Sequence, residues 1–235
     1  MKKVFIYISA IVVVVVVLIV AFVMTLASPR YGIVKGKIYD ELSGDAVRGV
    51  RLVLDERSTV IYQISRYELT KIPPAEHTLQ VSSPAGWISF SKTFKVRAGE
   101  NEVDIPLKGD KIPDLTGIIC FTESEKEGIT VEIRYVDSER IGMTEFPRLP
   151  IKINVTLRER VGREEPYEKG EKLFEGEVKD LWDSGEYLAK NKGFLPWDEV
   201  AVKFEDRKYA ILDVKVTLEQ GDFEDTIGDV KLFFE

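Results

Sequence analysis

An uncharged stretch near the start of the chain restricts its fold and location more than any other feature. The 24 residues from Val4 to Ala27 contain no charged side chain. As an α-helix this stretch would be about 36 Å long, enough to cross a hydrocarbon core about 30 Å thick. Lipid offers no hydrogen-bond partner to an open backbone, so a helix is the state in which such a segment can span. The sequence therefore predicts a transmembrane helix over residues 4–27, within an anchor of residues 1–28.

The flanking charges predict how this segment is oriented. Lys2 and Lys3 precede it, and only Arg30 follows closely. Because positive residues stay on the cytoplasmic side, we expect a single-pass protein of the cell membrane with a cytoplasmic N-terminus and extracytoplasmic C-terminal domains. A cleaved signal peptide, cut before Ser28, is the alternative. The apolar run is longer than the roughly 7–15 residues of a signal h-region, which favours the uncleaved anchor.

Composition excludes several classes of function. A net charge of -7 and a pI near 5.1 exclude a strongly basic nucleic-acid binder. One Cys excludes a disulfide framework, and one His leaves little material for acid–base catalysis at neutral pH. Glu supplies 25 of the 40 acidic residues, whereas Asn and Gln occur three times each. This balance is typical of a thermophile, and ordinary compositional drift is the alternative.

From residue 31 onward the chain alternates apolar and polar residues, and no window sustains a helical period over three turns. Alternation places apolar side chains on one face of a strand. In residues 31–107 the expected inward-facing residues are Val50, Leu52, Leu54, Leu79, Val81, Phe94, Val96, Val103, Ile105 and Leu107. Turn residues separate these runs, so we expect six or seven short strands in a small β-sandwich.

The order of these elements resembles a known family. Gly36 to Leu54 reads GKIYDELSGDAVRGVRLVL, which is similar to the opening two strands of carboxypeptidase regulatory-like domains. Later matching elements are Tyr67–Leu69, Pro73–Ala75, His77–Val81, Gly86–Trp87 and the closing segment Val96–Leu107. The resemblance implies a transthyretin-like sandwich over residues 31–107. It also implies an accessory role in binding, spacing or structural support.

A short linker, residues 108–114, precedes a second predicted domain, residues 115–235, and should give a stiff rod. The alternating residues predict strands, listed as Ile129–Tyr135, Ile151–Leu157, Val200–Phe204, Leu212–Leu218 and Val230–Phe234. An immunoglobulin-like sandwich is the expected architecture, which makes the whole chain an all-β protein behind its anchor. Residues 30–109 carry a net charge of +2 and residues 110–235 carry -11, so the outer domain is the acidic one.

Three groups of residues in the second domain are candidate sites. A long loop over residues 181–197 is expected to carry Trp182, Tyr187, Phe194 and Trp197, which could bind a sugar or protein or simply cover one end of the sandwich. An acidic loop over residues 221–229 is expected to carry Asp222, Glu224, Asp225 and Asp229. These carboxylates could bind Ca²⁺ outside the cell, or be solvated. Asn154 opens a glycosylation sequon on a translocated domain.

The remaining reactive side chains favour structural roles. His77 falls on the apolar face of a predicted strand, and Cys120 lies in an apolar run. The sequence therefore predicts a non-catalytic binding or structural module of the cell envelope, with an envelope protein or a glycan as partner. A carbohydrate-binding module is the first alternative. A hydrolase that uses paired carboxylates is the second, because such a pair leaves no linear signature.

Overall fold

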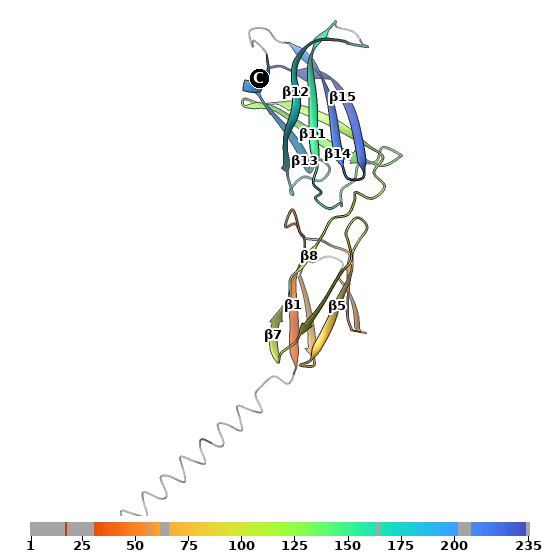
Figure 1. Ribbon diagram of the computed structural model, residues 1–235, viewed down its shortest axis with the longest axis vertical. Helices are drawn as coiled ribbons and strands as arrows, with labels where there is room; N and C mark the ends of the chain where they lie inside the picture. The colour runs from red at the N-terminus through yellow and green to blue at the C-terminus, as the bar shows by residue number, and fades with distance from the viewer. Residues whose placement is uncertain are drawn as a thin grey trace, which may run out of the picture.

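The computed structural model describes Val17 and residues 31–55, 57–61, 66–162, 165–201 and 208–233. Within these residues the regular structure from residue 31 onward is β-strand, apart from one 3₁₀ turn. Figure 1 shows two β units placed end to end along the long axis of the molecule. No helix in the described part of the chain is long and apolar enough to cross a membrane. The predicted anchor, residues 4–27, lies outside the described residues except for Val17.

The first unit is a sandwich of two four-stranded sheets. One sheet contains β1 (Gly32–Asp40), β4 (Arg66–Ile72), β7 (Gly99–Glu102) and β8 (Ile105–Leu107). The other contains, in order, β3 (Arg57–Ile61), β2 (Val50–Leu54), β5 (Glu76–Ser82) and β6 (Phe90–Lys95). β1 is central, because it pairs antiparallel with β4 on one edge and parallel with β7 and β8 on the other. The core residues Leu52, Leu79 and Ile105 are fully buried, which confirms the predicted strand faces.

Gly36 lets β1 and the segment after β7 approach closely. A Cβ atom at this position would lie 2.0 Å from the carbonyl oxygen of Val103. That distance is impossible for a real side chain, so the strand can pass here only with glycine. The tyrosine on the neighbouring strand closes the same region, because the Tyr67 hydroxyl donates a 2.6 Å hydrogen bond to the Val103 carbonyl.

The second unit is one antiparallel sheet of seven strands in the order β15-β14-β11-β12-β13-β10-β9. Its elements are β9 (Gly117–Ser124), β10 (Gly128–Val136), β11 (Lys152–Val161), β12 (Glu168–Trp182), β13 (Asn191–Pro196), the 3₁₀ helix η1 (Trp197–Glu199), β14 (Tyr209–Leu218) and β15 (Gly221–Lys231). β12 pairs with β11 as far as Val178 and with β13 from Lys179 onward. The expected separation into two immunoglobulin-like sheets is therefore wrong, because β12 belongs to both halves. Alternation predicts which side chains face inward, but it does not predict which strands pair.

The seven-stranded sheet curls until its two edge strands lie side by side. The Cys120 amide on β9 donates a 2.7 Å hydrogen bond to the Asp225 carboxylate on β15. The Ser124 hydroxyl reaches the Lys231 carbonyl in the same way. The inward faces form one core, and every residue in this list is fully buried: Ile129, Val131, Ile133, Tyr135, Ile153, Leu157, Leu212 and Val216. These residues confirm the predicted alternation in β10, β11 and β14.

Two other predicted strands differ from the structure. Val200 follows η1 and is not in a strand, and Val202 and Phe204 lie outside the described residues. The last strand begins at Gly221 and ends at Lys231. It therefore starts earlier than the predicted Val230–Phe234 strand. Phe223 and Ile227 are the apolar residues of this strand. The acidic residues between them obscure the alternation by which a strand is recognised.

The segment that joins the two units is hydrogen-bonded to each of them. The Asp110 amide donates to the Gly86 carbonyl at 2.8 Å, which attaches the segment to the first unit. The backbone N–H and C=O of Ile112 both bind the Gln220 side chain, at 2.7 and 3.1 Å, which attaches it to the second. Gly86 adopts a φ of +93°, and a Cβ there would lie 2.6 Å from the Lys111 carbonyl. These contacts support the predicted stiffness of the rod, which stays a prediction.

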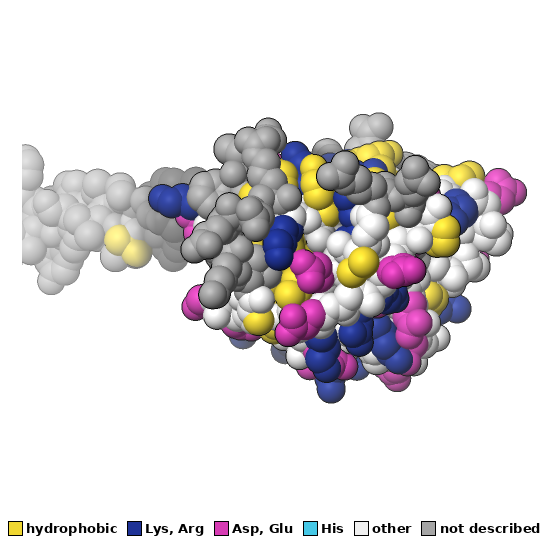
Figure 2. All heavy atoms as spheres, turned by 90° about the horizontal axis from the view of Figure 1, so that it is seen from above, with side chains coloured by type: hydrophobic (Ala, Val, Ile, Leu, Met, Phe, Trp, Pro, Cys, Tyr) yellow, Lys and Arg dark blue, Asp and Glu magenta, His cyan; other side chains and the backbone are white. Residues whose placement is uncertain are grey.

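Charged side chains are interspersed at the far end of the second unit. Figure 2 views this end and shows Lys and Arg side chains beside Asp and Glu side chains. Ion pairs of this unit include Lys169 with Asp213 at 2.7 Å and Lys208 with Glu159 at 3.1 Å. Exposed pairs of this kind contribute at most about 1 kcal/mol each, so they keep the surface soluble more than they stabilise the fold.

Candidate binding site between the two units

A cavity of about 390 Å³ lies where the two units meet, and residues of both units line it. Its aromatic residues are Trp87 from the first unit and Phe146, Trp182 and Tyr187 from the second. Its charged residues are Asp40, Asp45 and Arg48 from the first unit and Glu145, Glu186 and Lys190 from the second. The lining thus combines aromatic rings with an equal share of polar groups, and the volume is within the usual range of a small-molecule site.

Asp40, at the end of β1, holds the floor of this junction together. Its side chain is 2% exposed. Oδ1 accepts hydrogen bonds from the Leu42 and Ser43 amides and from the Ser43 hydroxyl. Oδ2 accepts the Trp87 indole N–H at 3.1 Å and the Arg148 amide of the second unit, also at 3.1 Å. One buried carboxylate thus shapes the turn after β1, orients a cavity tryptophan and binds the other unit.

Trp182, the last residue of β12, connects the two units from the other side. Its indole N–H donates a 2.9 Å hydrogen bond to Asp45 of the first unit. Its ring packs edge-to-face on Phe146 with centroids 5.9 Å apart, and Phe146 packs in the same way on Tyr135 at 5.1 Å. The cavity wall is therefore continuous with the core of the second unit.

A chain of polar groups runs from that core to the junction. The Tyr135 hydroxyl donates to Asn191 Oδ1 at 3.1 Å, and Asn191 Nδ2 donates to Asp180 at 2.8 Å. Asp180 lies 3.9 Å from the Arg148 guanidinium, whose backbone amide binds Asp40. Burial raises the pKa of Asp180 above its ordinary value. These bonds satisfy the polar groups that the apolar core would otherwise leave unpaired.

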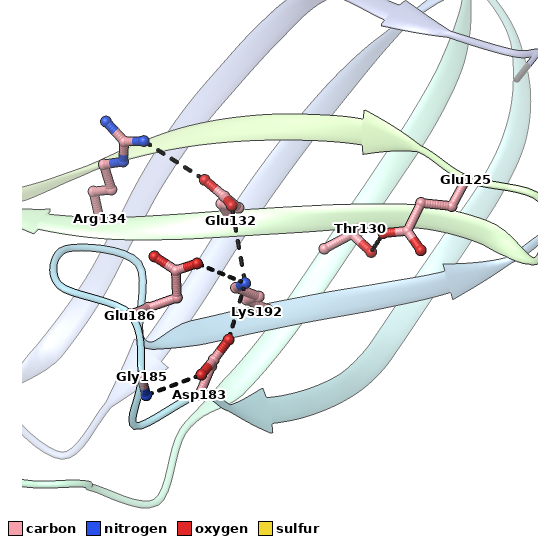
Figure 3. Close-up of polar contacts among 8 residues, drawn as sticks. All are labelled: Glu125, Thr130, Glu132, Arg134, Asp183, Gly185, Glu186 and Lys192. Atoms are coloured by element: carbon pink, nitrogen blue, oxygen red, sulfur yellow. Dashed lines mark hydrogen bonds and ion pairs between the residues drawn. The ribbon is translucent and has the colours of Figure 1, made fainter. Parts of the chain in front are cut away.

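The loop between β12 and β13 forms one wall of the cavity and is held by Lys192 (Figure 3). The Lys192 ammonium lies 3.3 Å from Asp183, 3.4 Å from Glu186 and 4.0 Å from Glu132 on the neighbouring strand. Asp183 also accepts the Gly185 amide at 3.0 Å, which turns the chain back. Burial lowers the pKa of Lys192, but Asp183 and Glu186 raise it by more. One lysine therefore anchors the start and the middle of this loop to the sheet.

The substitution Lys192→Met should loosen this loop. The Gly185 amide and then Lys192 lower the pKa of Asp183. A carboxyl with a lowered folded pKa stabilises the fold fully above its unfolded pKa, about 3.9, and loses this contribution as pH falls through the folded value. In the parent protein we therefore expect the hydrogen-exchange protection of the Gly185 amide to fall below about pH 4. Lys192→Met should reduce that protection already at pH 7 and weaken its pH dependence.

Lys172→Met is the matched control, because its one ion partner among the described residues is Glu175, which is exposed on the same strand, β12. This variant should leave the protection of the loop unchanged. Equal protection factors in Lys192→Met and the parent protein would contradict the anchoring role.

Two of the four aromatic residues predicted to share a loop meet at the cavity. Trp182 and Tyr187 line it, and the Tyr187 side chain is 72% exposed. Phe194 lies on β13, and the Trp197 indole binds the Glu125 carbonyl at the opposite end of the unit. The expected long loop is a β-hairpin, so β13 carries the last two residues away. The sequence did not indicate Phe146, which lies on an irregular segment without periodicity.

The acidic residues predicted to lie in a loop are on strand β15. Asp222 binds Lys215 at 2.7 Å, with Glu224 3.8 Å from the same ammonium. Asp225 points the other way and accepts the Cys120 amide. Asp229, further along the strand, pairs with Arg160. In the part of the chain that the structure describes, no three His, Cys, Asp or Glu side chains form a group that could hold a metal.

His77 and Cys120 occupy structural positions. The two ring nitrogens of His77 lie 2.6 Å from Asp55 Oδ2 and 2.7 Å from the Pro73 carbonyl oxygen. Cys120 is buried, and burial together with Asp225 raises the pKa of its thiol to about 12, which disfavours the reactive thiolate at neutral pH. Asn154 is exposed on β11, and its glycosylation stays a prediction.

Comparison with known proteins shows only distant similarity. No protein-family model matches the chain, and no curated protein matches it. A solved DUF3823 family protein from Parabacteroides merdae is 14% identical, with 87% of this chain and 100% of that chain covered at a TM-score of 0.30. A candidate carbohydrate binding protein from Bacteroides uniformis is 13% identical, with 85% and 99% covered at a TM-score of 0.29. These TM-scores are too low to assign a shared fold, so the role of the cavity is inferred from its own residues.

Proposed function

We propose that this chain is a membrane-tethered binding protein that works outside the cytoplasmic membrane, and that its ligand occupies the cavity between the two β units. The observation that carries this proposal is the construction of the cavity. Asp40 and Trp182 each bind across the junction, so the walls from two units are held as one site. The uncharged segment over residues 4–27 supports the tether and the extracytoplasmic location.

Carbohydrate is the ligand class that the cavity favours. Aromatic rings stack on the apolar faces of sugar rings, and charged and hydroxyl groups beside them bind the sugar hydroxyls. Trp87 and Trp182 have ordered indole groups here, and Tyr187 presents a largely exposed ring at the rim. An envelope protein that inserts a side chain into the same cavity is the alternative partner.

The carboxylates of the cavity support binding more than hydrolysis. A glycosidase needs one carboxyl free to give a proton and a second free to act as base or nucleophile. Asp40 accepts five hydrogen bonds. Asp45 is bound by the Trp182 indole and Glu186 by Lys192. Three of the four cavity carboxylates thus bind groups of the protein itself, and Glu145 is the one without a partner among the described residues. A glycosidase needs two free carboxyl groups, so the proposal includes no chemical step.

Sugar binding to the full-length protein in non-ionic detergent tests the proposal. We expect isothermal titration calorimetry with cellobiose and with methyl glucuronide to detect at least one sugar. We expect Tyr187→Ala to weaken that binding about tenfold, because the ring is lost from the rim. Tyr31→Ala is the control, since Tyr31 is also exposed but precedes β1 and does not line the cavity. Equal affinities in Tyr187→Ala and Tyr31→Ala would count against the cavity as the site.

A further inference from the structure

Some charged side chains of the cavity have a hydrogen-bond or ion-pair partner in the protein, and others do not. Three of its four carboxylates already bind a partner, as described above, and only Glu145 at the rim has none among the described residues. Its two cations, Arg48 and Lys190, have no carboxylate within ion-pair distance in the part of the chain that the structure describes. Arg48 and Lys190 are therefore cations of the cavity that lack an ion partner among the described residues, although the lining as a whole contains four carboxylates and two cations.

Lys190 is placed where a ligand would meet it. Its ammonium lies 5.3 Å from the centroid of the Phe146 ring and 5.8 Å from that of Trp182, and all three residues line the cavity. Ring faces attract a cation, but less strongly than a carboxylate does. Among the residues that the structure describes, Lys190 is half-buried with two ring contacts and no ion pair, so its ammonium is open to an anion.

Resting on the proposed sugar-binding function, we infer that the cavity takes a sugar that carries a carboxylate, of the uronic acid class. The carboxylate lies at Lys190 and Arg48, and the sugar ring lies against the aromatic wall that ends in Tyr187. This arrangement gives both cations a charged hydrogen-bond partner, and the bond at the half-buried Lys190 is stronger than one in water. Lys190 is thus the residue that sets the preference for an acidic sugar over a neutral one.

The test compares two sugars that differ in this one group. Methyl β-glucuronide and methyl β-glucoside are titrated into the full-length protein in non-ionic detergent at equal ionic strength. We expect the glucuronide to bind at least tenfold more tightly. Lys190→Met, which keeps the apolar stem, should remove this preference by weakening glucuronide binding much more than glucoside binding. Added salt should weaken glucuronide binding only.

Lys231→Met is the matched control, because the Lys231 ammonium lies 5.8 Å from the Phe233 ring, a similar cation–ring contact at the other end of the unit. This variant should keep the full preference. If both sugars bind equally and Tyr187→Ala weakens both, the acidic-sugar inference is wrong while the proposed function stands. If neither sugar binds, both are wrong. If tetraglutamate binds through Lys190 and the glucuronide does not, the sugar assignment is overturned in favour of an acidic peptide.

Discussion

Asp40→Ala should lower the free energy of unfolding by about 3–5 kcal/mol and uncouple the two units, because it removes a buried charged acceptor from several donors at once. The Trp87 indole and the Arg148 amide would lose their partner together with the turn after β1. We expect chemical denaturation to show a lower midpoint and two separated transitions where the parent protein has one. Ligand affinity should fall as well, since the cavity walls would no longer be held together.

Two further variants distinguish the loss of the bonds across the junction from the loss of the turn after β1. Asp104→Ala is the control, because Asp104 is exposed and accepts one hydrogen bond, from the Lys37 amide at 2.8 Å, so its loss should cost about 1 kcal/mol. Asp40→Asn keeps the shape and Oδ1, but its amide nitrogen cannot accept from Trp87 and Arg148. It should therefore uncouple the units while preserving the turn. A loss in Asp40→Ala no larger than in Asp104→Ala would refute the role of Asp40 as the shared acceptor.

Trp182→Ala should lower the free energy of unfolding by about 3 kcal/mol and abolish sugar binding. The substitution removes the ring that packs on Phe146 and the indole that binds Asp45 across the junction. Trp182→Phe retains most of the ring packing but loses the indole N–H, so it should cost about 1 kcal/mol. Denaturant unfolding and calorimetric titration of the same preparations provide both values.

Trp197→Ala is the matched control for this tryptophan. Trp197 is also half-buried with its indole N–H bound, to the Glu125 carbonyl at 2.7 Å, but it lies at the far end of the second unit. Its loss should destabilise the second unit by a similar amount and leave sugar affinity unchanged. A parallel loss of binding in Trp197→Ala would mean that the binding defect reports general destabilisation and not the cavity.

Strand faces were readable from the sequence because the alternation that marks them is local. Ile129, Val131, Ile133 and Tyr135 were predicted to face one way, and all four are fully buried on β10. The acidic residues of β15 show where the same reasoning failed. Asp225 on that strand satisfies the amide of Cys120 on an edge strand more than a hundred residues earlier. A carboxylate whose partner is so distant in sequence is indistinguishable from a solvated loop residue.

The candidate site shows the same limit. Trp182 and Tyr187 were predicted as binding residues because tryptophan and tyrosine are frequent in binding sites, whichever fold presents them. Phe194 and Trp197 were included with them because they are near in sequence. In the structure β13 runs away from the cavity after the hairpin, so both residues lie towards the other end of the sheet. Phe146 gave no signal, because it lies outside any periodic segment.

The sequence by itself determined an apolar N-terminal segment long enough to span a membrane, an all-β chain beyond it and the inward face of most strands. Each of these follows from residue type and short-range period. Only the tertiary structure decided that β12 joins two halves of one sheet and that a cavity forms between the units. Asp40, Phe146 and Trp182 are brought together there by strand pairing and by hydrogen bonds across the junction. Interactions between residues so far apart in the chain depend on the whole packed arrangement, and no local pattern encodes them.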